Sequence, residues 1–287
     1  MQDLKGKTAV VTGGASGMGN AMARRFAREG MKIVLIDVEA EPLAEATQAL
    51  EADGIEVFAQ QVDVSDATAM DAVAKAALER FGSVHIVCNN AGVGSGGHMW
   101  DLTTEDWEFC IRPNLWGVIH GVRVFTKHMI AQDEGHIVNT ASMAGLVTVP
   151  GMGPYNVTKH GVVTLSESLY HELAAIGSAV GVSVLCPGHV NTRIWESHRN
   201  RPEELAATAR DPEGDEQRAT HEYFRKMLQT SMPADQVADL VHAAVLDGTF
   251  YIHTHENVYA AVQARLQGIL DATSPATPEG GQAVFSK

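Results

Sequence analysis

Short apolar runs of strand length recur along the chain, and longer amphipathic stretches separate them. The runs lie at residues 7–12, 32–37, 55–62, 84–88, 135–140, 180–186 and 250–253. The stretches between and after them have helical periodicity at residues 20–29, 40–52, 66–81, 107–129, 155–176, 233–246 and 256–272. Continuous apolar runs are typical of strands buried on both faces, and the helices between them provide crossovers. The pattern therefore predicts an α/β fold with a parallel sheet and right-handed connections.

The turn after the first predicted strand is rich in glycine. Gly13, Gly17 and Gly19 stand between that strand and the predicted helix at 20–29. Glycine lets a backbone approach a pyrophosphate closely, and the N-terminus of the following helix attracts its charge. A glycine-rich turn on its own is equally typical of a plain tight turn. Its place in a strand–turn–helix–strand unit favours a dinucleotide site.

Asp37 ends the second predicted strand. A carboxylate at this place can accept hydrogen bonds from both hydroxyl groups of an adenosine ribose, and it repels a 2′-phosphate. No Lys or Arg occurs between Gly13 and Gly19, so nothing basic is placed to hold NADP. The alternative is a solvated acid at a strand end. The pattern predicts NAD as the cofactor.

Tyr155 and Lys159 lie four positions apart at the start of the predicted helix at 155–176. Positions i and i+4 share a helix face, so the phenol and the ammonium can point into one pocket. A cation at roughly 4 Å stabilises a phenolate by ~4 kcal/mol at an effective dielectric of ~20. Such a contact would lower the tyrosine pKa by about 3 units, towards the range of a general base. For this spacing alone, an ordinary surface pair is the alternative.

Two further polar residues are candidates for the same pocket. Asn114 follows Pro113 inside the predicted helix at 107–129, where proline removes a backbone donor and kinks the helix. Asn114 can expose a carbonyl to an active-site water there, or it can simply cap or pack beside the kink. Ser142 follows the strand at 135–140, at the carboxyl edge where open α/β sheets bind ligands.

Composition narrows the classes of function. The chain has 287 residues, a formal net charge of −14 and three cysteines. The acidic balance argues against nucleic acid or an anionic membrane as partner. We expect a cytoplasmic protein, because no apolar run of 18 residues occurs, the first strand follows the N-terminus directly, and the cysteines show no paired spacing. His253 and His255 have no evident third ligand, so no metal is expected.

Residues 193–231 differ in character from the rest of the chain. They are polar and charged, with Ile194, Trp195 and Met227 embedded among them. This composition predicts mobile helices that cover a site. We expect a single domain over residues 1–273 with a substrate lid at about 189–232, followed by a tail at 274–287.

Together the motifs resemble those of the short-chain dehydrogenase/reductase (SDR) family. The matching elements occur in family order over about residues 5–255: TGGASGMG at 12–19, Asp37, Asp63-Val64, NNAG at 89–92, Asn114, Ser142, YNVTK at 155–159, and Pro187-Gly188 with Thr192. The resemblance implies a single-domain, doubly wound Rossmann fold. It also implies a seven-stranded parallel sheet in the order 3-2-1-4-5-6-7, with helices on both faces. Pro113 departs from the family pattern, in which an ordinary helix former is more usual.

The resemblance also implies site residues. The implied catalytic residues are Asn114, Ser142, Tyr155 and Lys159. The implied residues for binding NAD are Gly13, Ser16, Gly17, Met18, Gly19, Asp37, Asp63, Val64, Asn90, Ala91, Gly92, Tyr155, Lys159, Pro187, Gly188, Val190 and Thr192. A pocket between residues 93–100, 143–152 and the lid is expected to bind substrate through Ser142, Val93, Met143, Leu146, Met152, His189 and Trp195.

The predicted helices at 107–129 and 155–176 carry apolar residues all round, which predicts burial on both sides. One side needs the sheet and the other needs a partner subunit. By resemblance, the assembly is a homotetramer, or a homodimer if the C-terminal extension blocks the second interface.

The leading hypothesis is an oxidoreductase that transfers a hydride between NAD and a bulky, weakly polar secondary alcohol or ketone, with Tyr155 as general base or acid. The expected bulk rests on the mostly apolar pocket. It also rests on a resemblance of residues 190–204 to a bacterial subset acting on bulky or aromatic secondary alcohols. One alternative is a non-catalytic NAD-binding sensor or scaffold on the same fold. Another is an epimerase or dehydratase, which needs a larger C-terminal domain.

Overall fold

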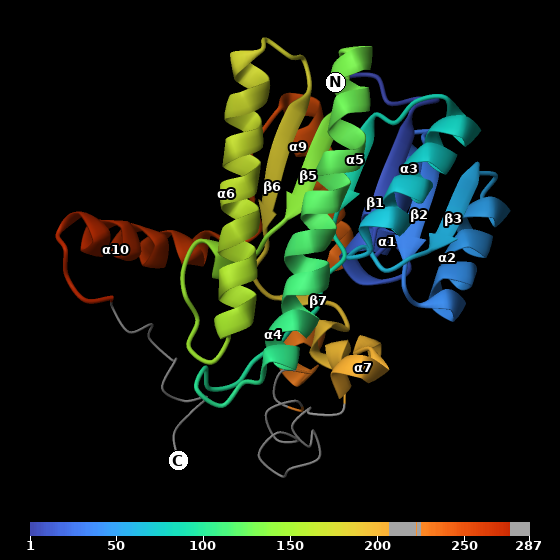
Figure 1. The fold of residues 1–287 in the computed structure, drawn as a ribbon. Helices are drawn as coiled ribbons and strands as arrows, with labels where there is room; N and C mark the ends of the chain where they lie inside the picture. The colour runs from blue at the N-terminus through green and yellow to red at the C-terminus, as the bar shows by residue number, and fades with distance from the viewer. Residues whose placement is uncertain (207–221, 223–224, 276–287) are drawn as a thin grey trace.

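The structure is a computed structural model that describes residues 1–206, 222 and 225–275. Its centre is a seven-stranded parallel sheet in the order β3-β2-β1-β4-β5-β6-β9 (Figure 1). This confirms the predicted order, because β7 (Val190–Asn191) and β8 (Met232–Pro233) pair separately and β9 is the seventh strand of the sheet. The strands are β1 (Thr8–Thr12), β2 (Lys32–Asp37), β3 (Val57–Gln61), β4 (Ile86–Asn89), β5 (His136–Thr140), β6 (Gly181–Cys186) and β9 (Tyr251–His253).

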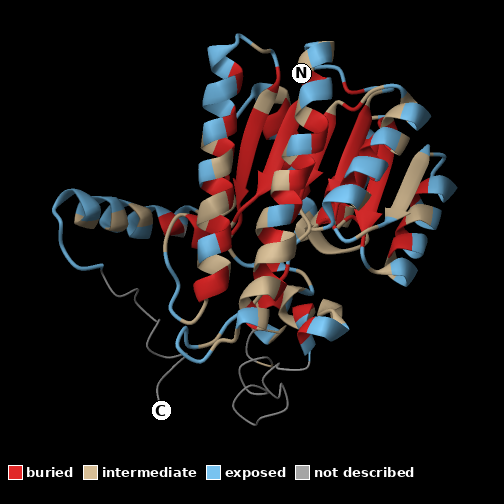
Figure 2. Ribbon diagram, in the orientation of Figure 1, coloured by how far each residue is buried: buried red, intermediate tan, exposed pale blue. Residues whose placement is uncertain are grey.

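Helices cover both faces of this sheet. Successive side chains of a strand point to opposite faces, so Ala9 and Val11 pack in one core cluster and Val10 in another. One face is covered by α1 (Gly17–Arg28), α2 (Ala40–Ala52) and α9 (Ala234–Asp247), and the other by α3 (Ala67–Phe81), α5 (Gly117–Gln132) and α6 (Gly153–Ala175). Figure 2 shows the central strands buried throughout, whereas β3 at the edge is only partly buried. The chain is therefore a single doubly wound domain, as expected.

Local capping sets several helix ends. Asp66 precedes α3 and accepts hydrogen bonds from Thr68 N at 2.8 Å and Ala69 N at 3.0 Å. Thr103 and Asp106 form a capping box at the start of α4 (Thr104–Ile111). These side chains satisfy backbone groups that a helix end leaves without partners. The caps stabilise the helices beside the carboxyl edge of the sheet.

The helix expected over residues 107–129 is not a single kinked helix. The chain passes from α4 through a π-helical turn, η1 (Arg112–Trp116), into α5. Pro113 has no N–H to donate, so the regular α-helical ladder cannot continue there, and the wider π turn accommodates the gap. Asn114 lies in this turn with its side chain fully buried.

Several small elements lie at the carboxyl edge, and the two short helices after residue 193 fall where the sequence predicted helices. The small elements are η2 (Met143–Gly145), β7 (Val190–Asn191), η3 (Ile194–Asn200), α7 (Glu203–Ala206) and β8 (Met232–Pro233), and the two short strands pair in parallel. Parts of the expected lid, at residues 207–221 and 223–224, lie outside the described residues, and so does the expected tail from residue 276 onward.

The expected last helix at 256–272 is shorter than predicted. It consists of a 3-10 turn, η4 (Glu256–Val258), followed by α10 (Tyr259–Leu270), which projects from the body of the domain (Figure 1). Every residue of α10 is described, and none is buried. Within the described part of the chain, no helix is both long and apolar enough to cross a membrane.

Candidate active site

A cleft lies along the carboxyl edge of the sheet. Its walls come from the turn after β1, the ends of β2, β4 and β5, the start of α6, and the segment from Thr192 to Leu205. The strand order reverses between β1 and β4 at this edge. Open α/β sheets bind their ligands at such a reversal, because the loops leave on opposite faces and a crevice forms between them.

The glycine turn after β1 forms one wall of the cleft. Gly13 (φ 64°) and Gly17 (φ 54°) have left-handed backbones, which glycine adopts without steric cost. A Cβ atom at Gly19 would lie 2.0 Å from the carbonyl oxygen of Gly13, so the turn can pack against α1 only with glycine there. Ser16, at the N-cap of α1, makes no side-chain capping bond. The first N–H groups of α1 therefore remain available to an anion, and the turn fits a pyrophosphate.

Thr12 ties this turn to the end of β4. Its hydroxyl oxygen accepts hydrogen bonds from Asn90 N at 2.9 Å and Ala91 N at 3.0 Å. Asn90 Nδ2 donates to Thr12 O at 3.0 Å. A Cβ atom at Gly13 would lie 2.9 Å from Ala91 Cα. The two walls are thus closely packed where a dinucleotide would cross from one to the other.

Asp37 lies at the end of β2, as predicted, and is 8% exposed. Its carboxylate accepts hydrogen bonds from Ala15 N at 3.0 Å and Glu39 N at 3.1 Å. Burial raises the pKa of Asp37, and these backbone donors oppose the rise. Each carboxylate oxygen has a further lone pair, so the group can still accept ribose hydroxyls.

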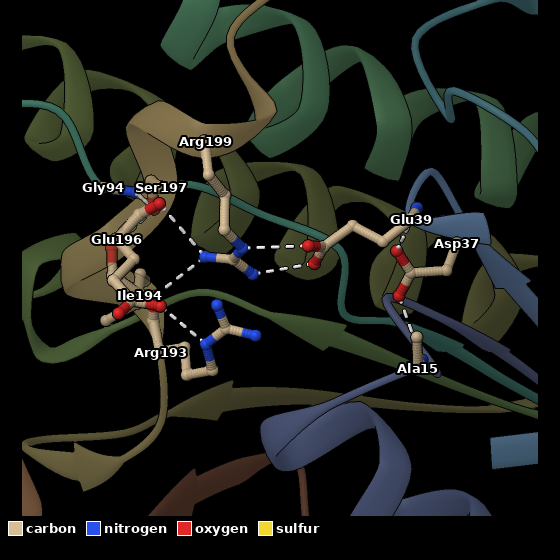
Figure 3. A network of polar contacts seen from close by, with 9 residues as sticks. All are labelled: Ala15, Asp37, Glu39, Gly94, Arg193, Ile194, Glu196, Ser197 and Arg199. Atoms are coloured by element: carbon tan, nitrogen blue, oxygen red, sulfur yellow. Dashed lines mark hydrogen bonds and ion pairs between the residues drawn. The ribbon is translucent and has the colours of Figure 1, made fainter. Parts of the chain in front are cut away.

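The expectation that nothing basic is placed to hold NADP rests on residues 13–19 and does not consider two arginines from a distant segment. Arg193 and Arg199 line the same cleft. Arg199 pairs with Glu39 through two hydrogen bonds, Nε to Oε1 at 2.9 Å and Nη2 to Oε2 at 2.7 Å (Figure 3). This pair lowers the pKa of Glu39 and raises that of Arg199. The two residues are 160 positions apart, so no local pattern in the sequence indicated the contact.

Tyr155 and Lys159 both line the cleft from the start of α6. Lys159 is buried, with its Nζ 5.5 Å from the centroid of the Tyr155 ring, and it donates to Thr140 O at 2.9 Å. Burial raises the pKa of Tyr155 to about 12 and lowers that of Lys159 to about 8.

The expected lowering of the Tyr155 pKa by Lys159 is therefore wrong for these contacts. Desolvation of the phenolate dominates, and the neighbouring Ser142 side chain offsets it only in part. The ammonium of Lys159 lies over the ring and is bonded to a backbone carbonyl. Helical spacing made Lys159 a neighbour of Tyr155, but it did not reveal how strongly both groups are buried.

The two remaining predicted catalytic residues differ in placement. Ser142 lies near Tyr155, and its Oγ accepts from Ala144 N at 3.1 Å and donates to Pro187 O at 3.5 Å. The side chain of Asn114 is directed instead to the backbone of Val93 and is not among the residues that line the cleft. Asn114 nonetheless lies close to Lys159, because a Cβ atom at Gly92 would be 2.9 Å from Asn114 Oδ1 and 3.6 Å from Lys159 Nζ.

Most of the predicted cofactor residues lie together in the cleft. They are Gly13, Ser16, Gly17, Met18, Asp37, Asp63, Val64, Asn90, Ala91, Gly92, Tyr155, Lys159, Pro187 and Thr192. Gly19, Gly188 and Val190 are not among its lining residues. Thr140 also lines the cleft, and its hydroxyl oxygen is buried without a hydrogen-bond partner in the described residues. That polar atom suits a bound group with a hydrogen-bond donor.

The predicted substrate residues are less well grouped. Val93 lines the cleft, whereas Ser142, Met143, Leu146, Met152, His189 and Trp195 are not among its lining residues. Val93 packs instead with Phe109 and Leu205, which also line the cleft and which the sequence analysis missed. No local motif marked Phe109, because its place in the cleft depends on how α4 packs against Val93 and Leu205.

Among the described residues, no group of three or more His, Cys, Asp or Glu side chains could hold a metal ion. The cysteines Cys88, Cys110 and Cys186 are all free and buried. The cleft therefore offers a tyrosine hydroxyl and a buried ammonium beside a wall suited to a dinucleotide, and a serine hydroxyl lies next to the tyrosine.

Comparison with known proteins agrees with this geometry. Residues 7–203 match the family model for short chain dehydrogenases. The chain is 31% identical to a CLA biosynthesis dehydrogenase/reductase of Lactiplantibacillus plantarum over 96% of this chain and 97% of the relative. It is 32% identical to a C alpha-dehydrogenase of Sphingobium sp. over 98% and 92%. The solved structure of an SDR from Burkholderia phymatum in complex with NAD is 44% identical, with a TM-score of 0.93 over 97% of this chain and 99% of that one. The chain therefore belongs to the short-chain dehydrogenase/reductase family.

Proposed function

We propose that the protein is an NAD-dependent oxidoreductase that interconverts a bulky, weakly polar secondary alcohol and its ketone. The observation that carries the proposal is that Tyr155 and Lys159 line the cleft together, with Ser142 next to Tyr155. The Ser142 hydroxyl lies close enough to Tyr155 to offset part of the rise in its pKa that burial causes, and Lys159 Nζ lies 5.5 Å from the Tyr155 ring centroid. The dehydrogenase and reductase names of the two relatives support this class of reaction over a non-catalytic sensor or scaffold.

Tyr155 is the general acid for ketone reduction and the general base for alcohol oxidation. Its pKa of about 12 keeps the hydroxyl protonated at neutral pH, which is the form that donates a proton to a ketone oxygen. Ser142 hydrogen-bonds the same substrate oxygen and holds it beside Tyr155. In the oxidation direction, Tyr155 as the phenolate accepts the alcohol proton. NAD supplies the hydride acceptor, and that chemistry belongs to the cofactor.

The residues of the cleft support NAD as the cofactor. The N-terminus of α1 and its glycine turn would hold the pyrophosphate. Asp37 would accept the hydroxyls of the adenosine ribose, and its negative charge disfavours a 2′-phosphate. Lys159 and Thr140 lie at the other end of the cleft, where they would bind the nicotinamide half. The Burkholderia phymatum relative, whose structure contains NAD, supports the same choice.

The substrate would enter beside an apolar part of the cleft. Val93, Phe109, Ile194 and Leu205 line it there. The segment from Thr192 to Leu205 contributes to the cleft wall and contacts both the cofactor side, through Glu39, and α4 on the opposite side, through Asp106. We therefore infer that this segment belongs to the substrate lid. Apolar lining favours a bulky aromatic or alicyclic substrate over a phosphorylated one.

The proposed function is tested by absorbance at 340 nm with NAD and a panel of benzylic, terpenoid, steroid and polyol alcohols. We expect NADH formation with bulky secondary alcohols and a fall in kcat of about 100-fold or more in Tyr155→Phe. Tyr170→Phe is the matched control, because Tyr170 lies on the same helix and is exposed. Near-normal turnover in Tyr155→Phe would refute the assigned base, and activity confined to polyols would refute the pocket.

We further propose that the protein is a homo-oligomer, a tetramer or a dimer. Val157, Tyr170 and Ile176 on or next to α6 are exposed large hydrophobic residues, and α10 projects with Leu266, Ile269 and Leu270 exposed. Exposed apolar surface of this kind marks contacts with another chain. Light scattering should give a mass of at least twice 30.7 kDa. A monomer would contradict both assemblies.

A further inference from the structure

The guanidinium of Arg199 is fixed from two sides at the edge of the cleft next to Asp37. On one side, Nη1 donates to the carbonyl oxygens of Arg193 and Glu196, both at 3.1 Å. On the other side, Nε and Nη2 donate to the two carboxylate oxygens of Glu39 at 2.9 and 2.7 Å (Figure 3). Four of the five N–H donors of a guanidinium are thus engaged. The backbone contacts hold the group so that the fork of Nε and Nη2 points at Glu39.

Glu39 stands beside the carboxylate that would bind the adenosine ribose. Its backbone N–H donates to Asp37 Oδ1 at 3.1 Å, and Asp37, Glu39 and Arg199 all line the same cleft. The positive charge of Arg199 acts on Asp37 as well as on Glu39. The side chains of Glu39 and Arg199 are only 17% and 23% exposed, so solvent screens their pairing incompletely.

The fork of Arg199 has the geometry that binds phosphate. Two parallel N–H groups of a guanidinium pair with two oxygens of a carboxylate or of a phosphate in the same way. A 2′-phosphate would lie beside the carboxylate that holds the ribose hydroxyls, which here is Asp37. Arg199 is therefore placed for a 2′-phosphate, but Glu39 already occupies its fork.

We propose that Glu39 is a specificity-determining residue that excludes a 2′-phosphate by occupying the fork of Arg199, independently of the repulsion from Asp37. This inference rests on the proposed function in placing the adenosine of NAD at Asp37. Removing Asp37 alone leaves Arg199 neutralised by Glu39. Removing Glu39 alone frees Arg199 but leaves the repulsion from Asp37. A ligand with a 2′-phosphate therefore gains most of its affinity only when both carboxylates are removed.

The test compares two probes that differ only in the 2′-phosphate, 5′-AMP and adenosine 2′,5′-bisphosphate. Their dissociation constants are measured by calorimetry on the purified full-length protein, and NADH binding is measured by fluorescence. The variants are Asp37→Ala, Glu39→Gln, the double variant of both, and the double variant carrying Arg199→Gln. Glu41→Gln is the matched control, because it makes the same charge change in α2 but is exposed and is not among the residues lining the cleft.

For each variant, the dissociation constant of 5′-AMP is divided by that of the bisphosphate. We expect this ratio to be at least tenfold higher in the double variant than in Asp37→Ala. Arg199→Gln should remove this gain, and Glu41→Gln should leave the ratio of the two constants unchanged. The ratio cancels any general loosening of the segment that carries Arg199. Suppose that NADH binds normally, but the double variant shows no gain in bisphosphate affinity or keeps that gain with Arg199→Gln. The inference about Glu39 is then overturned, and the proposed function stands. If the unmutated protein does not bind NADH, the proposed function and the inference fall together.

Discussion

Asn114 holds the backbone of Val93 with both ends of its side-chain amide. Oδ1 accepts from Val93 N at 2.8 Å, and Nδ2 donates to Val93 O at 3.0 Å. Asn114 is fully buried in the π turn between α4 and α5, and Val93 lines the cleft. Asn114, which lies in the π turn, thus positions the loop at Val93 that forms one wall of the site.

Asn114→Ala should destabilise the protein because it leaves a buried N–H and a buried carbonyl of Val93 without partners. We expect a loss of about 2–4 kcal/mol in the free energy of unfolding, together with a fall in turnover. Asn114→Asp is the informative comparison, because a carboxylate can still accept from Val93 N but cannot donate to Val93 O. Urea unfolding measures the stability of both variants, and we expect Asn114→Asp, which keeps one of the two bonds, to be the more stable. Stability of Asn114→Ala within about 0.5 kcal/mol of the unmutated protein would show that the two bonds contribute little.

Lys159→Met should stabilise the protein at neutral pH while it reduces activity. Burial lowers the pKa of Lys159 to about 8 from 10.5, so the folded state binds its proton less tightly than the unfolded state does. The resulting cost is fully present below about pH 8 and disappears as the pH rises towards 10.5. A shift of this size corresponds to up to about 3 kcal/mol. The lost hydrogen bond to Thr140 O offsets part of the gain.

Urea unfolding of both proteins at pH 7 and pH 9.5 measures this linkage. The stability advantage of Lys159→Met should be about halved at pH 9.5, because the folded lysine is then mostly neutral while the unfolded lysine is still mostly protonated. An advantage that stays constant with pH would mean that the effect comes from packing and not from the charge. A less stable variant at pH 7 would mean that the surroundings of Lys159 compensate its burial.

Sequence reasoning succeeded where a local pattern determines a local structure. The apolar runs predicted the strands because a strand buried on both faces admits few polar side chains, as in Val10 and Val34. Gly19 could be recognised because the strand–turn–helix spacing leaves no room for a side chain there. In both cases the physical cause lies within a few residues of the pattern.

The same reasoning failed where the cause is distant or depends on burial. Arg199 and Glu39 meet across 160 positions, and nothing near either residue distinguishes them from other surface charges. The spacing of Tyr155 and Lys159 predicted their proximity but gave the wrong direction for the Tyr155 pKa, because the desolvation of a phenol is set by the whole pocket.

Gly19→Ala should weaken cofactor binding through a steric contact alone. The new Cβ atom would lie 2.0 Å from Gly13 O and 2.7 Å from Asn90 Nδ2, so the turn must move away from α1. We expect at least a tenfold rise in the dissociation constant for NADH. Gly268→Ala in α10 is the control, because its Cβ atom would meet Thr273 Oγ1 at an ordinary 3.4 Å. Unchanged NADH binding in Gly19→Ala would show that this turn does not contact the cofactor.

Arg201 joins the segment over the cleft to α4. Its Nη1 donates to Asp106 Oδ1 at 2.7 Å, and its Nε donates to Leu205 O at 2.7 Å. The guanidinium lies 5.4 Å from the centroid of the Phe109 ring. The side chains of Arg201 and Asp106 are only 13% and 9% exposed, so removing one partner leaves a largely buried charge uncompensated.

Arg201→Gln should therefore release Leu205 from its contact with Val93 and Phe109 and open the apolar part of the cleft. We expect the KM for the alcohol to rise by about tenfold, because one lost buried contact of 1.4 kcal/mol changes an equilibrium constant by that factor. NADH binding should change by less than about twofold, because Arg201 does not line the cleft, whereas Arg199, on the cofactor side, does. Arg123→Gln is the control, since Arg123 forms an exposed pair with Asp71. An equal loss of NADH binding and of substrate binding would show that the segment is a single rigid cover and not one anchored separately on each side.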